Sequence, residues 1–184
     1  MTVKTHIVSS LVVSLPLAII AEYIGLFDIS EIINDHLLLS LLLAGVIFGS
    51  TFPDIDEPQS YIGRKIPFVS FFLSAFIQHR GITHTFIILF LYVLLFYFLQ
   101  SYFDLYFDER AEIFMLGFIF GNIGHIFGDA TTKSGVAVFY PFSSKQFGML
   151  PKRYRYVTGS SVEYIIILPI FSALLFYEYT YLVK

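Results

Sequence analysis

The chain has 184 residues, of which 57% are hydrophobic and 14% charged, and its mean hydropathy is +0.76. A soluble domain carries about a quarter charged residues, so this composition excludes an ordinary soluble protein and indicates that lipid is the main solvent. The absence of cysteine excludes disulfides, thiolate metal sites and a cysteine nucleophile, so any metal must be bound by His, Asp and Glu.

Five apolar segments are predicted to cross a membrane, because each is close to the ~20 residues that a bilayer requires. The first lacks a small-residue cleavage site and is interpreted as a retained span. A sixth apolar segment, 67–77, is too short to span and is predicted to be a re-entrant or interfacial helix. The sequence therefore predicts an all-α polytopic membrane bundle, a single integral-membrane domain over 1–184, with spans at about 7–27, 36–52, 85–103, 111–128 and 162–182.

Glycines recur at intervals of three or four residues in two of these spans. Gly45 and Gly49 form a small-xxx-small pair in the second span, and the fourth span carries a longer stripe. Such patterns allow the backbones of neighbouring membrane helices to approach closely. We therefore expect close helix contacts along the stripe formed by Gly117, Gly121, Gly124 and Gly128.

Most of the positive charge lies on one side of this topology, whereas the connections 28–35 and 104–110 on the other side are acidic. The positive-inside rule then places the N-terminus and the basic loops in the cytoplasm and the C-terminus outside. Nine of the 11 Lys and Arg residues lie on the basic side: Lys4, Arg64, Lys65, Arg80, Lys133, Lys145, Lys152, Arg153 and Arg155.

Imidazole and carboxylate groups gather on the same basic side. His125 and Asp129 are four residues apart, so on a helix they share one face and lie close enough to bind one ion. Asp54 and Asp56, between Pro53 and Pro58, are expected to point the same way in an extended segment. Ionisable groups at a membrane boundary are costly unless something binds them. The candidate metal ligands are His6, Asp54, Asp56, His79, His84, His125 and Asp129.

This set of nitrogen and oxygen donors suits zinc, manganese or iron(II). Seven candidates exceed what one tetrahedral site uses, so one or two ions, most simply Zn²⁺, are expected. Each residue taken alone has a plainer interpretation. A histidine can be a headgroup-level polar residue, the aspartates can end a helix, and His125 with Asp129 can form a hydrogen-bonded pair. Their co-location favours the metal.

Four motifs in order resemble those of the YdjM-like proteins. They are His6 preceded by Thr5, Pro53-Asp-Ile-Asp56, His79-Arg-Gly-Ile-Thr-His84, and His125-x-x-x-Asp129 followed by Thr-Thr-Lys-Ser-Gly135. The resemblance covers roughly 1–142. That family comprises bacterial and archaeal inner-membrane proteins predicted to be metal-dependent hydrolases, and it is distantly grouped with zinc-dependent phospholipase C and single-strand nucleases. The resemblance implies metal-ligand roles for all seven candidates.

The predicted function is metal-dependent hydrolysis of a phosphoester in a membrane lipid or lipid-linked substrate. Asp54 or Asp56 is the expected proton acceptor from water, and Arg80 and Lys133 are the candidate phosphate contacts. The more distal cations, Lys145, Lys152, Arg153 and Arg155, are expected to meet anionic headgroups. No nucleic-acid partner is expected. The alternatives are a non-catalytic metal-binding sensor or regulator and a hydrolase of a soluble nucleotide.

Overall fold

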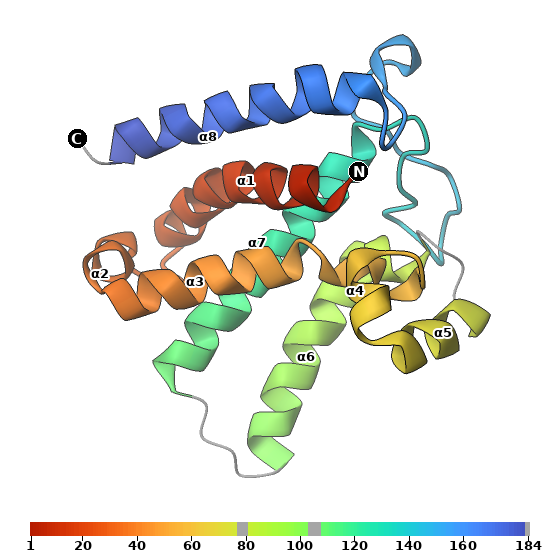
Figure 1. Ribbon diagram of the computed structural model, residues 1–184. Coiled ribbons are helices and arrows are strands. Elements are labelled where there is room, and N and C mark those ends of the chain that lie inside the picture. Colours follow the sequence, from red (N-terminus) through yellow and green to blue (C-terminus); the bar gives the residue numbers. More distant parts are fainter. Residues whose placement is uncertain (77–80, 103–107, 183–184) are drawn as a thin grey trace.

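The computed structural model describes residues 1–76, 81–102 and 108–182, and within these ranges it contains helices and no strands (Figure 1). This is the all-α bundle that the composition predicts. Four short turns accompany the longer helices: the 3₁₀ turns η1 (Phe52–Asp56), η2 (Ile82–His84) and η3 (Lys152–Tyr154), and the π-helical turn η4 (Glu163–Ile167). The α-helices are α1 (Val3–Tyr23), α2 (Ile29–Asn34), α3 (His36–Gly49), α4 (Tyr61–Lys65), α5 (Pro67–Phe76), α6 (Phe86–Tyr102), α7 (Glu109–Ala130) and α8 (Leu168–Leu182).

Four stretches of the described chain are long and apolar enough to cross a bilayer, namely Val3–Tyr23, His36–Asp56, Glu109–Ala130 and Glu163–Thr180. The predicted third span corresponds to α6, which has 17 residues and thus lies at the lower limit for a spanning helix. Leu89 of α6 packs against Ile126 of α7 in one apolar cluster. α6 therefore runs along α7 as part of the bundle.

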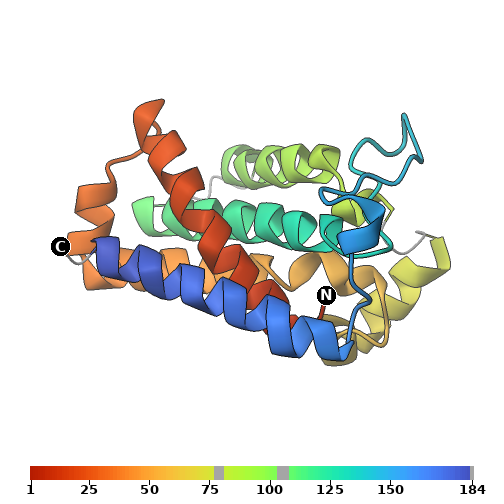
Figure 2. The same cartoon turned by 90° about the horizontal axis from the view of Figure 1, so that it is seen from above.

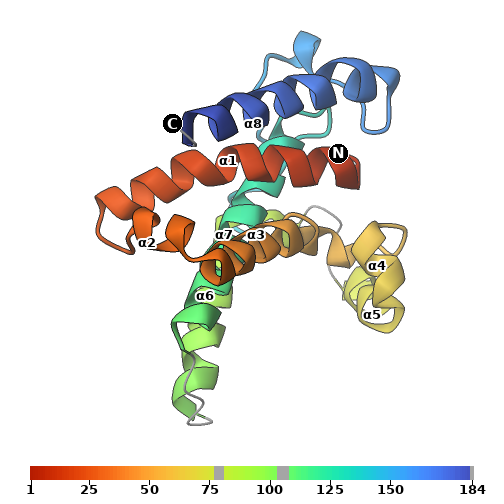
Figure 3. The ribbon, with the colours of Figure 1, turned by 60° about the vertical axis from the view of Figure 1, so that its left-hand side comes forward.

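The bundle has two distinct ends. The N-terminus, α4, α5 and the long loop after α7 lie at one end, whereas α2 and the C-terminus lie at the other (Figures 1 and 2). This separation matches the division that the charge pattern predicts between the basic segments and the acidic connection 28–35. Figure 3 shows α8, α1 and α3 stacked in that order, with α7 crossing them.

Glycines bring the backbones of α3 and α7 into contact. A Cβ atom added at Gly45 or Gly49 would collide with backbone oxygens of α7, and one added at Gly117 or Gly121 would collide with backbone oxygens of α3. Both helices thus carry glycine where they cross, which is the packing that the small-xxx-small pattern predicts. The close approach fixes α3, and the η1 turn that follows it, against α7.

The same glycine stripe continues toward the end of α7, where its neighbour is α1. A Cβ atom at Gly124 would lie 2.7 Å from Ser10 Oγ, and one at Gly128 would lie 3.1 Å from Ser9 Oγ. Ser10 Oγ also donates to the Gly121 carbonyl across 3.1 Å. α3 is therefore held against the middle of α7, and α1 against its last turns.

Glu163 ties the start of α1 to the start of the last span. Its Oε1 accepts from the Thr2 backbone N–H at 2.7 Å and from Thr2 Oγ1 at 2.9 Å, and its Oε2 accepts from Gly159 N at 2.7 Å. The fully buried carboxylate thereby satisfies an N–H group at the N-terminus of α1. The position of Glu163 at the beginning of an apolar span does not predict that it contacts the N-terminus of α1.

The loop after α7 is folded back onto the helix end. Met149 N donates to the Ala130 carbonyl at 2.8 Å, and Lys133 N donates to the Tyr156 carbonyl at 2.9 Å. The Tyr156 side chain is buried, and this burial raises the pKa of its hydroxyl to about 12. The hydroxyl lies 3.0 Å from Thr131 Oγ1. The segment predicted as a long polar loop thus forms a closed cover at the end of α7.

Candidate metal centre

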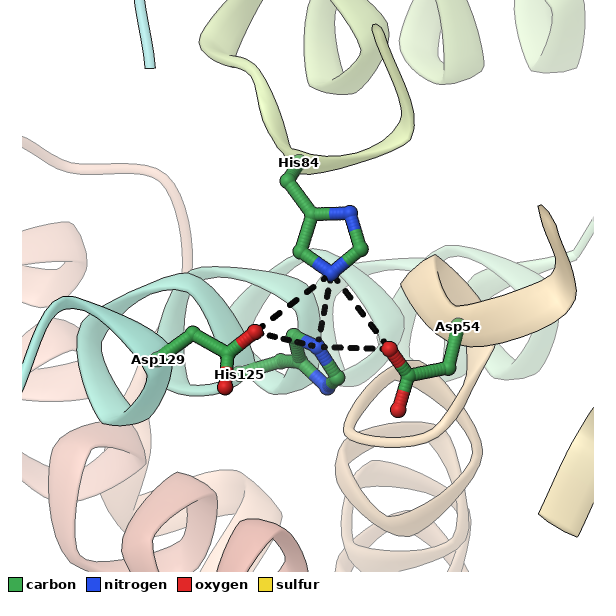
Figure 4. A group of neighbouring side chains, drawn as sticks. All are labelled: Asp54, His84, His125 and Asp129. Carbon is green, nitrogen blue, oxygen red and sulfur yellow. Dashed lines mark hydrogen bonds and ion pairs between the residues drawn. The ribbon is translucent and has the colours of Figure 1, made fainter. Parts of the chain in front are cut away.

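Four side chains from three segments converge at this end of the bundle (Figure 4). The last turns of α7 supply His125 and Asp129, whose i, i+4 spacing places them on one helix face as the sequence predicts. η1 supplies Asp54, and η2 supplies His84. One ligand atom from each of the four residues lies within 4.8 Å of the others.

The closest approach in this cluster is between two imidazoles. His84 Nε2 and His125 Nε2 are 3.1 Å apart. Asp54 Oδ1 lies 3.4 Å from the first nitrogen and 3.5 Å from the second, and Asp129 Oδ2 lies 3.6 Å and 3.8 Å from them. Two nitrogens and two carboxylate oxygens thus face a common centre.

The tautomer of His125 follows from the hydrogen bond that its Nδ1 atom forms. His125 Nδ1 lies 2.7 Å from the Ser50 carbonyl oxygen, which can only accept a hydrogen bond. The proton of the neutral ring is therefore on Nδ1, and Nε2 carries a lone pair. Such a backbone contact is the usual way in which a metal-binding histidine is oriented.

His84 is fixed in the same tautomer by a relay of two side chains. Thr83 Oγ1 donates to Asp56 Oδ2 at 2.7 Å, so the hydroxyl proton is already committed. The same oxygen, 2.9 Å from His84 Nδ1, must then accept from the Nδ1–H group. In the neutral ring Nε2 again carries the lone pair. The sequence analysis missed Thr83, although a hydroxyl residue directly before a candidate ligand is a usable signal.

This arrangement is suited to a positive charge at its centre. Two nitrogen lone pairs at 3.1 Å, flanked by two carboxylate oxygens, are all acceptors and repel one another without a cation. Burial lowers the pKa of His84, which favours the neutral ring, the form that can bind a metal. The residues present therefore fit a divalent ion, and the N₂O₂ set suits zinc, manganese or iron(II).

His6 lies beside the cluster rather than within it. Its ring stacks on that of His125 with the centroids 3.7 Å apart and the planes 5° from parallel. His6 Nε2 is 3.5 Å from Asp129 Oδ1, the oxygen that the Met1 amino group also contacts at 2.6 Å. The side chain of His6 is buried, yet neither of its ring nitrogens forms a hydrogen bond within the described chain.

The structure corrects the prediction for Asp54 and Asp56. The segment around them is a 3₁₀ turn rather than an extended strand, so the two side chains diverge. Asp54 faces the imidazoles, whereas Asp56 accepts from Thr83 and acts on His84 only through that hydroxyl. Of the four clustered residues Asp54 is the most exposed, with 18% of its side chain accessible. The site is therefore least buried at η1.

Three further predicted residues remain to be placed. Two of them, His79 and Arg80, lie outside the described residues. Lys133 lies in the loop after α7, and its side chain is exposed. Among the described residues the centre comprises Asp54, His84, His125 and Asp129, with His6 stacked on His125 and Asp56 linked to His84 through Thr83.

Replacing Thr83 with valine is expected to weaken divalent-ion binding about 10- to 100-fold, because losing a partner that orients a metal ligand typically has this effect. Valine keeps the shape but leaves His84 Nδ1 and Asp56 without the bridging hydroxyl. Zinc competition titration measures the change. Thr83→Ser keeps the hydroxyl and is the control. Equal affinities in the two variants would show that the relay does not orient His84.

Comparison with known proteins places these features in context. A family profile described as YdjM inner membrane protein matches residues 1–182. The chain is 30% identical over 139 residues to "Uncharacterized protein YvsG" of Bacillus subtilis (strain 168), which covers 76% of this chain and 79% of that protein. It is 28% identical over 106 residues to "Inner membrane protein YdjM" of Escherichia coli (strain K12) and of Shigella flexneri, covering 58% of this chain and half of those proteins. No solved structure matches the chain.

Proposed function

The chain belongs to the YdjM inner membrane protein family, and we propose that it is a membrane-embedded, metal-dependent hydrolase of phosphoesters. One observation carries the proposal: two imidazole Nε2 atoms lie 3.1 Å apart between two carboxylates, one of which, Asp54, is partly accessible. Four converging acceptors are suited to a divalent ion, and such ions at partly open sites commonly serve hydrolysis.

The ion would be bound by Asp54, His84, His125 and Asp129. When bound, a zinc ion would lower the pKa of its bound water to about 7 and neutralise charge on phosphoryl oxygens. The protein contributes the tautomers, which direct both Nε2 lone pairs inward, and the helix face that fixes His125 relative to Asp129. These contacts preorganise the centre, so binding needs little rearrangement of the ligands.

Asp54 Oδ1 faces both imidazoles, so the second oxygen of this carboxylate, Oδ2, is the proposed proton acceptor on the least buried of the four residues. A water or a substrate that enters beside η1 meets this carboxylate first. Asp56 is assigned a positioning role through Thr83. Arg80 and Lys133 remain the candidate phosphate contacts on the basis of their sequence positions.

A second ion beside the first is favoured by the environment of His6. The two oxygens of the Asp129 carboxylate face different imidazoles, Oδ2 facing His84 and His125 and Oδ1 facing His6. Asp129 Oδ1 also contacts the Met1 amino group at 2.6 Å, so a cation already lies beside this oxygen, and a second metal ion there would take the place of the ammonium. We therefore assign the buried His6 to a second ion shared through Asp129.

The test uses purified protein in lipid nanodiscs, stripped with chelator and reloaded with Zn²⁺ or Mn²⁺. We expect two ions per chain by elemental analysis, one in His6→Gln, and phosphate or diacylglycerol release only after reloading. The substrate panel includes lipid phosphates, phospholipids and soluble nucleotides, so it also distinguishes the nucleotide alternative. A protein that binds metal but cleaves none of the panel would instead support the sensor or regulator.

Membrane placement follows from the same features. The family is one of inner-membrane proteins, and four long apolar spans accompany the centre. We assign the N-terminus and the metal centre to the cytoplasmic side, because the basic segments lie at that end of the bundle. Cysteine labelling from either side of sealed vesicles tests the assignment, and the absence of native cysteine simplifies it.

A further inference from the structure

The short helix α5 exposes most of its apolar side chains. Phe68 is 91% exposed, Phe71 74% and Phe76 76%, whereas Ser70 is fully buried on the opposite side. Ten residues at ~1.5 Å per residue give a length of about 15 Å, half of the ~30 Å hydrocarbon core, so α5 cannot span the bilayer. A row of phenylalanines this exposed is covered by something apolar when the protein is in place.

Two features of the surroundings identify lipid as the cover. Arg64 and Lys65, the last residues of α4, are exposed and immediately precede α5. Cations beside an apolar helix are complementary to anionic headgroups. α6, which follows η2, begins with the exposed apolar residues Phe86 and Phe90. The apolar surface of α5 thus lies at the end where the lipid-facing surface of a span begins (Figure 1).

We propose that α5 docks into the headgroup–acyl boundary of an anionic bilayer, with its phenylalanines among the acyl chains and Arg64 and Lys65 against lipid phosphates. The helix packs on η1 and α4 rather than on the main bundle. η1 carries Asp54, the least buried of the four ligands, so lipid contact at α5 lies on the side of the metal centre that is most accessible. In combination with the proposed function, this places the phosphate of an amphiphilic substrate at the ions and its chain along α5.

The docking is tested by tryptophan fluorescence, because the chain contains no tryptophan. Phe71→Trp creates a single reporter on the exposed face of α5 and keeps an aromatic side chain there. The protein is reconstituted in vesicles of phosphatidylglycerol and phosphatidylcholine, with or without brominated acyl chains. We expect blue-shifted emission, at least twofold quenching by the brominated lipid, and protection from iodide. Leu95→Trp, on the exposed face of α6, is the control for a lipid-facing position.

Two outcomes would overturn the proposal. Red-shifted emission that iodide quenches and brominated lipid does not would place α5 in water. Blue-shifted emission that is insensitive to bromine and strengthens with protein density would mean that a second copy covers α5. The measurement involves no catalysis, so docking can fail while hydrolysis stands, and the reverse also holds. Unchanged metal content in Phe71→Trp shows that the variant is folded.

Discussion

His125→Ala is expected to lose the divalent ion of the metal centre, with affinity falling by more than about 100-fold, since disturbing a ligand's orienting partner alone costs 10- to 100-fold. His125 takes part in most of the contacts that form the metal centre. Its Nε2 faces His84 and both aspartates, its Nδ1 contacts the Ser50 carbonyl, and its ring stacks on His6. Phosphate release should fall to the level of wild-type protein from which the metal has been removed with chelator.

His36→Ala is the matched control, because His36 is exposed at the start of α3, at the opposite end of the bundle. Metal content and phosphate release should equal those of the wild type. Thermal unfolding of each variant in detergent separates loss of the ion from loss of the fold. If His125→Ala binds as many ions as the wild type, the metal centre is rejected. If the wild type itself binds no ion, a shared proton joins the two imidazoles instead.

Gly45→Leu is expected to separate α3 from α7 and to destabilise the bundle by about 3 kcal/mol or more, because overpacking a close contact costs 1–3 kcal/mol and here the obstacle is backbone. A Cβ atom at Gly45 would lie 2.8 Å from the Phe118 backbone nitrogen, and Gly117 faces α3 in the same tight contact. The shift of the unfolding transition in detergent measures the effect.

Ala44→Leu is its control, since Ala44 is the preceding residue of the same helix and is exposed. It should unfold at the wild-type temperature. Gly45→Leu should also bind metal more weakly, although every ligand is intact. α3 leads into η1, which carries Asp54, and α7 carries His125 and Asp129, so separating the two helices separates the ligands. Similar unfolding of Gly45→Leu and Ala44→Leu would show that the glycine contact does not hold the two helices together.

Much of the fold could be predicted from local features of the chain. Runs of about 20 apolar residues must satisfy their backbone groups internally in lipid, so they form helices whatever their neighbours are. The glycine spacing in the second and fourth spans indicated close backbone contact, and α3 and α7 meet at those glycines. The i, i+4 spacing of His125 and Asp129 likewise fixed their common face.

The prediction for Asp54 and Asp56 was wrong because it relied on a local rule where two conformations compete. Flanking prolines favour an extended segment, but η1 forms a 3₁₀ turn that continues α3. The turn separates the two carboxylates and gives them different partners. Thr83 and Glu163 were missed for a related reason, since their hydrogen-bond partners lie 27 and 161 residues away along the chain.

The sequence by itself determined a membrane helical bundle, the end at which its ionisable groups gather, and the residue types available to bind a cation. Only the tertiary structure decided which groups share one centre and which nitrogen of each imidazole faces it. The physical reason is that helix formation and charge sidedness depend on neighbours along the chain. A ligand set depends on distances of 3–4 Å between η1, η2 and α7, and these are fixed by glycine contacts and buried hydrogen bonds between distant segments.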